Sequence, residues 1–261
     1  MPREFTSNTN NSESSVIAGR NAVTEALKKG HPIDCVYILK GAERGSMGKI
    51  IALAKERGIP IKDAAAQKLD TLCDGVVHQG VAAMAACHDF STMEDIFANA
   101  GDEPPFIIIC DNIEDPHNLG AIIRTAEAAG AHGVIIPKRR GVGLTATVAK
   151  TSAGAVEYMP VVRVPNIVNT IEELKQKGLW IFCADMDGQP WCSTDMGGPI
   201  GVVVGAEGSG VSRLTKEHCD FVVSLPMNGQ VNSLNASVAA AIVIYEAVRQ
   251  RAELPSFVKK K

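Results

Sequence analysis

Short apolar runs alternate with segments of helical spacing along the second part of the chain. The runs are FIIIC (106–110), GVIIP (133–137), VVRV (161–164), LWIFCA (179–184), IGVVVG (200–205) and FVVSL (221–225). Strands that are apolar on both faces are typical of a parallel sheet covered by helices on each side, because an exposed face would carry polar residues at every second position. We therefore predict an α/β fold with a parallel sheet over residues 105–261.

The first part of the chain has the same alternation on a smaller scale. Its elements are predicted, in chain order, at Gly19–Lys29, Cys35–Leu39, Lys49–Arg57, Ala65–Leu72 and 80–86. They suffice for a small α/β domain with its own core, which we assign to residues 16–88. The polar residues 1–15 are expected to be disordered. The acidic segment 89–104, which leads into a pair of prolines, is expected to be a linker.

Composition excludes several classes of protein. No apolar run approaches the roughly 18 residues of a membrane-spanning helix, and residues 1–15 lack the apolar core of a signal peptide, so we expect a cytoplasmic protein with no membrane partner. The seven cysteines form no CxxC pair, and the six histidines no HxxxH spacing, which argues against a disulfide framework and a metal site. The net charge of −3 does not decide whether the protein binds RNA, because binding depends more on local basic clusters such as Lys138–Arg140. That cluster is either a solvated surface or a phosphate contact.

Three segments that follow apolar runs carry the candidate chemistry, since parallel α/β sheets bind ligands at the carboxyl ends of their strands. The first, DNIEDPHNLGAIIRTAEAAG, comes directly after the strand at 106–110 and contains Asn118 and Arg124. Alternatively, Asn118 is a helix N-cap and Arg124 pairs with Glu127. On a helix the two side chains are about 120° and about 9 Å apart, so a long arginine side chain could still reach the strand ends.

The other two segments are rich in glycine and in amide side chains. VVVGAEGSGVS carries Glu207 after a late strand, and its residue order matches neither a P-loop nor the dinucleotide fingerprint, which argues against a dehydrogenase. An ordinary glycine turn is the alternative for this segment. LPMNGQVNSLNASVAAA sets Asn232, Ser233 and Asn235 before an apolar helix. Taken singly, Asn232 or Ser233 would be a helix cap.

Together and in this order, the three segments closely resemble the three motifs of the SpoU family of RNA ribose 2′-O-methyltransferases. In the first part, AGRNAVTEAL and HQGVAA resemble the small ribosomal-protein-like RNA-binding domain that many family members carry. The resemblance implies a parallel α/β domain with a C-terminal trefoil knot (the SPOUT fold), which periodicity could not predict. It also implies S-adenosylmethionine as cofactor and a symmetric homodimer formed through the knotted domain.

The family positions map onto residues of this chain. Those implied to surround the cofactor are Gly205, Leu225, Met227 and Leu234. Those implied to be catalytic are Asn118, Arg124, Glu207, Ser233 and Asn235. A guanidinium has no hydrogen-bond acceptor and keeps its proton, so we expect Arg124 to clamp a phosphate or ribose and to lower the pKa of the 2′-hydroxyl, with general-base action as the alternative. The other four side chains would form a polar lining that orients Arg124 and the ribose.

The substrate implied by the resemblance is a guanosine of 23S rRNA, because the N-terminal domain, the length and the HQGVAA segment are most similar to ribosomal members of the family. A transfer-RNA enzyme or an antibiotic-resistance methyltransferase of the same family is the alternative. A non-catalytic RNA-binding assembly factor would be expected to have lost the polar lining, which is present here. A small-molecule enzyme with a nucleotide cofactor is disfavoured, because no acidic ribose-binding residue follows the first strand.

Overall fold

The computed structural model of the chain describes residues 16–42, 45–230 and 233–254. They divide into two compact units, with the boundary after Ala85. The stretch 1–15, expected to be disordered, lies outside the described residues, as do Asn232 and the C-terminal lysines. In the described part of the chain, no helix combines the length and the apolar character that crossing a membrane requires.

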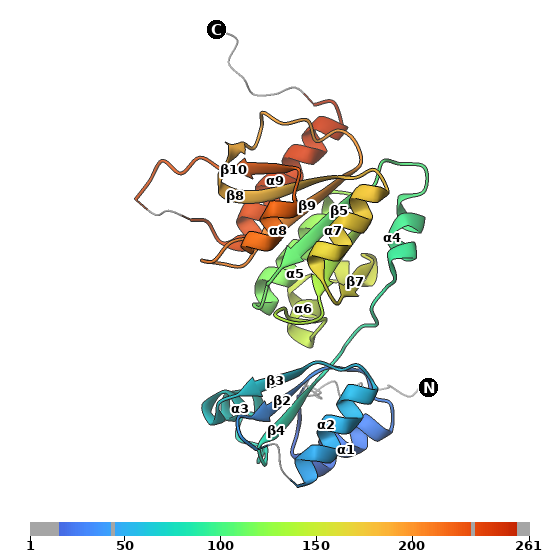
Figure 1. The fold of residues 1–261 in the computed structure, drawn as a ribbon, viewed down its shortest axis with the longest axis vertical. Coiled ribbons are helices and arrows are strands. Elements are labelled where there is room, and N and C mark those ends of the chain that lie inside the picture. The colour runs from blue at the N-terminus through green and yellow to red at the C-terminus, as the bar shows by residue number, and fades with distance from the viewer. Residues whose placement is uncertain (1–15, 43–44, 231–232, 255–261) are drawn as a thin grey trace, which may run out of the picture. The chain divides into compact units, whose positions relative to one another are not determined.

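The first unit is a four-stranded mixed sheet with three helices. Its elements are β1 (Val16–Ala18), α1 (Arg20–Lys28), β2 (Ile33–Leu39), α2 (Ser46–Glu56), β3 (Ile61–Ala64), α3 (Ala66–Cys73) and β4 (Val81–Ala85). The strand order is β1-β4-β2-β3, in which β4 runs antiparallel to both neighbours and β2 pairs with β3 in parallel. One core cluster lies under α1 and α2, and a smaller one under α3. The described residues up to Ala85 therefore form a small α/β unit with a core of its own (Figure 1).

The second unit is built on a six-stranded sheet in which every pair is parallel, as predicted. Its strands are β5 (Phe106–Asp111), β6 (Gly133–Pro137), β7 (Val161–Val164), β8 (Trp180–Pro190), β9 (Ile200–Gly205) and β10 (Phe221–Ser224). Its helices are α4 (Met93–Ala100), α5 (Pro116–Ala128), α6 (Ala146–Thr151), the 3-10 turn η1 (Ala155–Glu157), α7 (Ile167–Gln176), α8 (Arg213–His218) and α9 (Ala236–Arg251). The strand order is β10-β8-β9-β5-β6-β7.

Helices cover both faces of this sheet (Figure 1), because its central strands β5 and β9 carry apolar residues or glycine everywhere except at Asp111, the last residue of β5. Ile108 and Cys110 of β5 pack in the cluster formed with α5, α6 and α9, whereas Ile107 and Ile109 pack in the cluster formed with α4 and α7. In the pairing of β5 with β9, Asp111 lies beside Gly205. The loops that leave these two strands therefore start side by side at the carboxyl edge of the sheet.

The segment expected to be a linker instead forms part of the second unit. Thr92 and Asp95 make a capping box that starts α4, with Thr92 N donating to Asp95 Oδ2 at 2.7 Å. Ile96 of α4 is fully buried against the sheet, and a Cβ at Gly133 would lie 2.4 Å from its side chain. The prediction of a linker was based on the acidic composition of this segment. It missed α4 because this short helix has a single buried face and is otherwise polar.

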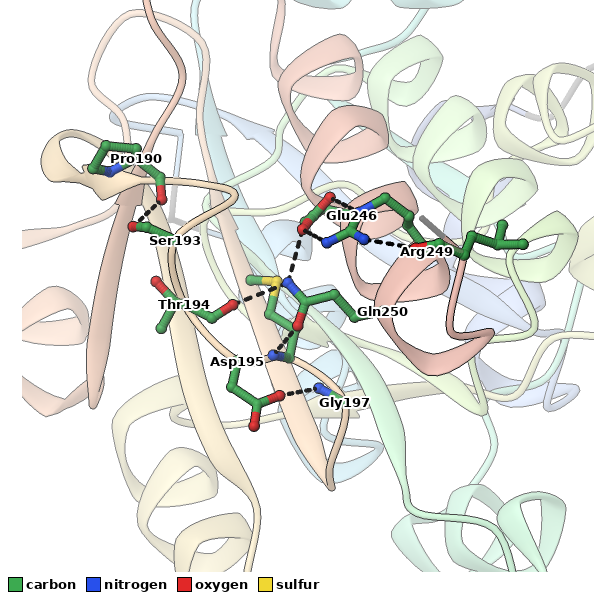
Figure 2. Close-up of polar contacts among 10 residues, drawn as sticks. Pro190, Ser193, Thr194, Asp195, Gly197, Glu246, Arg249 and Gln250 are labelled. Carbon is green, nitrogen blue, oxygen red and sulfur yellow. Dashed lines mark hydrogen bonds and ion pairs between the residues drawn. The ribbon is translucent and has the colours of Figure 1, made fainter. Parts of the chain in front are cut away.

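The C-terminal end of α9 holds the loop that joins β8 to β9. Gln250 accepts a hydrogen bond from Met196 N at 2.7 Å and donates to the carbonyl of Thr194 at 3.0 Å (Figure 2). Glu246, which is only 2% exposed, accepts from Arg249 at 2.7 and 2.8 Å and from Gln250 at 2.8 Å. Every side-chain oxygen and nitrogen of Glu246 and Gln250 has a hydrogen-bond partner, whereas Oγ1 of the neighbouring Thr194 is buried without one among the described residues. The side chains of Glu246 and Gln250 therefore form a closed structural network at the end of α9.

Candidate functional site

The first turn of α5 differs from the prediction in its capping residue. Asp115, not Asn118, is the N-cap: its Oδ1 accepts from His117 N at 2.9 Å, and Pro116 takes the first helical position. Proline at that position is a known helix-start signal, so the sequence could have placed the cap correctly. Asn118 lies inside the first turn, is 5% exposed and keeps its amide for contacts outside the helix.

Those contacts join the three candidate segments. Asn235 Nδ2 donates to Asn118 Oδ1 at 2.9 Å, and Asn118 Nδ2 donates to Glu207 Oε2 at 3.4 Å. The partners are 117 and 89 residues apart along the chain. Asn235 is also the N-cap of α9, because its Oδ1 accepts from Ser237 N at 2.9 Å and from Val238 N at 3.3 Å. The helix cap expected at Asn232 or Ser233 is thus formed by Asn235.

A cavity of about 180 Å³ opens beside this hydrogen-bonded chain. All four residues predicted to surround a cofactor line it, namely Gly205, Leu225, Met227 and Leu234. Two of the residues predicted to be catalytic, Glu207 and Ser233, line it as well. Most of the wall is apolar side chain or glycine-rich backbone, so it suits a flat apolar group that needs hydrogen bonds only at its edge.

Gly205 also fixes the shape of this wall. A Cβ at Gly205 would lie 2.1 Å from the carbonyl carbon of Gly210 and 2.2 Å from Val211 N. The turn that follows β9 folds back on the strand, with Ala206 and Gly210 exchanging two backbone hydrogen bonds. A side chain at 205 would force this turn open and change the cavity that it borders.

Two further lining residues were missed in the sequence. Asp185 and Met186 lie on β8, which extends beyond the apolar run LWIFCA. Asp185 binds Lys216 Nζ at 3.1 Å, and the side chain of Met186 is 66% exposed. Their position at the carboxyl end of an apolar strand was the available signal.

A second cavity, of about 480 Å³, shares a wall with the first. Ala206, Glu207 and Ser209 line both. The remaining lining residues come from the loop after β5, the start of α5 and the loop after β6, and include Asn118 and Arg140. The hydrogen-bonded side chains of Asn118 and Glu207 therefore stand where the two cavities meet.

Arg124 does not join this arrangement within one chain. Its side chain is exposed on α5, and it lines neither cavity. With the described residues it makes no hydrogen bond or ion pair, so the alternative pairing with Glu127 is absent too. The single chain thus brings together four of the five residues predicted to be catalytic and leaves Arg124 facing outward.

The cysteines do not contribute a nucleophile or a metal site to this region. Burial raises the pKa of the Cys110 thiol to about 12, and a hydrogen bond with Cys219 together with burial raises the pKa of Cys183. Both thiols therefore stay protonated near neutral pH. Among the described residues, no group of three or more His, Cys, Asp or Glu side chains is placed to hold a metal ion.

The fold and the two joined cavities define an α/β protein with a composite site at the carboxyl edge of a parallel sheet. Residues 105–245 match the model of the SpoU rRNA methylase family, and residues 16–90 match the model described as RNA 2′-O ribose methyltransferase substrate binding. The chain therefore belongs to the SpoU family of RNA methyltransferases.

Relatives and solved structures agree with this membership. YacO of Bacillus subtilis, assigned to the TrmH family of tRNA/rRNA methyltransferases, is 45% identical over 90% of this chain and 95% of its own length. A protein of Staphylococcus saprophyticus with the same assignment is 47% identical over 92% and 97%. The methyltransferase AviRb of Streptomyces viridochromogenes, solved with S-adenosylmethionine, superposes with a TM-score of 0.59 at 25% identity over 91% of this chain and 90% of its own.

A narrower match comes from a tRNA modifying enzyme. The TrmH/SpoU enzyme of A. aeolicus superposes with a TM-score of 0.53 at 30% identity, over 58% of this chain and 77% of its own. The cofactor of the family is S-adenosylmethionine. The first cavity fits this molecule chemically, because apolar side chains offer faces for adenine, the loop backbone offers partners for its edge, and the carboxylate of Glu207 suits the positive charge on sulfur.

Proposed function

We propose that this chain transfers a methyl group from S-adenosylmethionine to a ribose 2′-hydroxyl of RNA, specifically of a guanosine in 23S rRNA. The observation that carries the proposal is the chain of hydrogen bonds through Asn235, Asn118 and Glu207, which lies at the junction of the two cavities. A methyl donor in the first cavity and a ribose in the second would face each other across these side chains. The knotted arrangement of the C-terminal segments and the guanosine are carried by the family resemblance.

The protein's own task in this reaction is to place the ribose and to handle its proton. The cofactor supplies a methyl group on positively charged sulfur, which is already a strong electrophile. Glu207 Oε2 is held by Asn118, whereas Oε1 has no hydrogen-bond partner among the described residues. We assign Oε1 to accept a hydrogen bond from the ribose, and Ser233 and Asn235 to complete the polar lining. Holding the hydroxyl in line with the methyl group lowers the entropic part of the barrier.

A second copy of the chain would complete the site. The face of α9 that carries Val238, Ile242 and Tyr245 is apolar, and Val238 and Tyr245 are 48% and 49% exposed. Such a stripe suits a helix-to-helix contact between copies. α9 packs against α5, which bears the exposed Arg124, so a dimer through α9 would bring Arg124 close to the interface. Sedimentation equilibrium at micromolar concentration tests this, and the mass of a single chain would contradict it.

The first unit offers a basic groove for the rest of the RNA. Arg20, Lys28 and Lys49 line a cavity of about 910 Å³ together with uncharged polar groups and Glu25. Glu25 is already paired with Lys28 at 2.7 Å, and Arg20 is fixed by donating to the carbonyl of Gln79 at 3.0 Å. The excess of cations favours phosphate groups. This supports a role of residues 16–88 in binding the RNA substrate.

Methyl transfer tests the proposal directly. Unmodified 23S rRNA and transfer RNA transcripts are incubated with the protein and S-adenosylmethionine labelled on the methyl group. Label on a ribose 2′-oxygen blocks alkaline cleavage of the adjacent phosphodiester, so it appears in alkali-resistant dinucleotides. Label in transfer RNA alone would show that transfer RNA, and not 23S rRNA, is the substrate. Label found only on bases, or no label at all, would contradict methyl transfer to a 2′-oxygen.

Replacing Arg124 tests the role assigned to it. We expect Arg124→Ala to lower single-turnover methyl transfer at least about 100-fold while the calorimetric affinity for S-adenosylmethionine stays within about twofold, because the guanidinium acts on the reacting ribose and not on the cofactor. Glu127→Ala, an exposed residue of the same helix, is the matched control and is expected to behave as wild type. Undiminished turnover of Arg124→Ala would show that the catalytic cation lies elsewhere.

A further inference from the structure

The second cavity has the size and position of a site for one nucleotide. Its volume of about 480 Å³ lies within the range of about 300–1,000 Å³ that is usual for small-molecule sites. It shares Glu207 with the first cavity and reaches Asn118 at the junction. Enzymes that modify structured RNA act on nucleotides turned out of the stack into such a pocket. These statements rest on the proposed function, which places the methyl donor in the first cavity.

The charges around the cavity are strongly uneven. Among the described residues that line it, three carry carboxylates, namely Glu114, Asp115 and Glu207, and one carries a positive charge, Arg140. A nucleotide carries its negative charge at the phosphate and is neutral at ribose and base, so its phosphate is repelled from the acidic side and attracted to Arg140. The carboxylates in turn accept hydrogen bonds from ribose hydroxyl and base amino groups.

The side chain of Arg140 is available for this contact. It is exposed and forms no hydrogen bond or ion pair with the residues that the structure describes. Its guanidinium matches the geometry of a phosphate with two parallel N–H···O bonds. Lys138 and Arg139 precede it in the same loop, so positive charge continues along the chain from the cavity.

The backbone on both walls of the cavity is held in an unusual conformation. Arg140 has φ = 58° and Asn112 has φ = 61°, the left-handed region that residues other than glycine adopt rarely. Asparagine tolerates this region, but arginine gains nothing there by itself. Val142 N donates to the carbonyl of Ile113 at 2.9 Å and ties the two walls together. Strain of this kind gathers at sites where a side chain must be aimed before the ligand arrives.

We propose that the second cavity receives the target nucleotide and that Arg140 binds its phosphate group. Arg140 is then a substrate-binding residue that sets the distance of the ribose from Glu207. The matched control is Arg139, which has the same side chain one position earlier, is exposed and does not line the cavity. Arg140→Gly is the preferred variant, because glycine accepts the positive φ and removes only the side chain.

The first experiment measures single-turnover transfer to unmodified 23S rRNA and transfer RNA transcripts. For Arg140→Gly we expect at least a tenfold rise in the RNA concentration at half-maximal rate, with the affinity for S-adenosylmethionine unchanged within twofold and no loss of melting temperature. Arg140→Lys should recover part of the loss, and Arg139→Gly should stay within threefold of wild type. Equal losses in Arg140→Gly and Arg139→Gly would overturn the proposal, since a diffuse basic surface gives that result.

A second experiment separates the proposal from the proposed function. Nuclear magnetic resonance titrations compare guanosine 5′-monophosphate with guanosine as probes, in wild type and in Arg140→Gly. We expect the wild-type protein to prefer the phosphorylated probe at least fivefold and Arg140→Gly to lose the preference. Should no RNA accept a methyl group while this preference is present, the proposed function fails and the nucleotide site stands. A wild-type protein without the preference rules the site out.

Discussion

The two ends of α9 use polar side chains in opposite ways. At its C-terminal end, Glu246 is buried, Gln250 bonds to both helix and loop, and the bonds among them measure 2.7–3.0 Å (Figure 2). At its N-terminal end, Asn235 is exposed and caps the helix, and it is linked through Asn118 to Glu207 by bonds of 2.9 and 3.4 Å. One network is closed, whereas the other ends at a carboxylate that borders two cavities.

The difference separates stability from function within a single helix. A closed network in a buried setting fixes the positions of its members, and removal of any one of them leaves another unsatisfied. An open network contributes less to folding, and its unsatisfied atoms remain available to a ligand. This explains why so many small polar residues precede an apolar helix: they cap it and also furnish hydrogen-bonding groups at the junction of the cavities.

The largest effect expected from this comparison is on stability at the closed end. Glu246→Ala removes the partner of Arg249 and one partner of Gln250, and we expect the free energy of unfolding to fall by about 3 kcal/mol, the lower end for breaking a buried ion pair because Arg249 remains 24% exposed. Urea unfolding measures the change. Methyl transfer below the melting transition should stay within about twofold of wild type, and a variant that is stable but inactive would contradict the division between the two ends.

A smaller effect, on activity alone, is expected at the open end. Asn235→Asp keeps an acceptor for Ser237 N and Val238 N, so α9 stays capped. It replaces the amide donor to Asn118 by a carboxylate oxygen and adds negative charge to a network that ends at Glu207. We expect methyl transfer to fall at least tenfold, about 1.4 kcal/mol in activation free energy, with little change in melting temperature.

Asn235→Ala is the control for that variant, because it removes the cap as well as the donor. It should lose activity to a similar degree and, in addition, about 1 kcal/mol of stability. If Asn235→Asp transferred methyl groups at the wild-type rate, the bond to Asn118 would be structural and the N-terminal end of α9 would resemble the C-terminal end.

The comparison also marks where sequence reasoning reached its limit. The parallel sheet was predictable because strands such as β5 are apolar from Phe106 to Cys110, up to the final Asp111. The Asn118–Asn235 contact spans 117 residues, and no local pattern encodes it, so only the family resemblance pointed to it. Periodicity also could not find the packing of Ile96 on Gly133, because a short helix with one buried face reads as a polar linker. The location of Arg140 on a cavity wall could not be predicted either, because it depends on how the loops after β5 and β6 pack against each other.

The smallest expected effect is a loss of stability at low pH, and it again involves the C-terminal end of α9. The hydrogen bond from Arg249 lowers the pKa of Glu246 in the folded state below its ordinary value of 4.5. A carboxyl group whose pKa is lower in the folded than in the unfolded chain stabilises the fold at pH values above its pKa in the unfolded chain. This stabilisation is lost as the pH falls through the pKa of the group in the folded chain. We expect Glu246→Gln to cost about 1 kcal/mol at pH 7 and progressively less below pH 4.5, because protonation removes the same charge from the wild-type protein. Urea unfolding at a series of pH values measures both proteins, and a difference that persists undiminished at pH 3 would mean that packing around Glu246, rather than its charge, stabilises the end of α9.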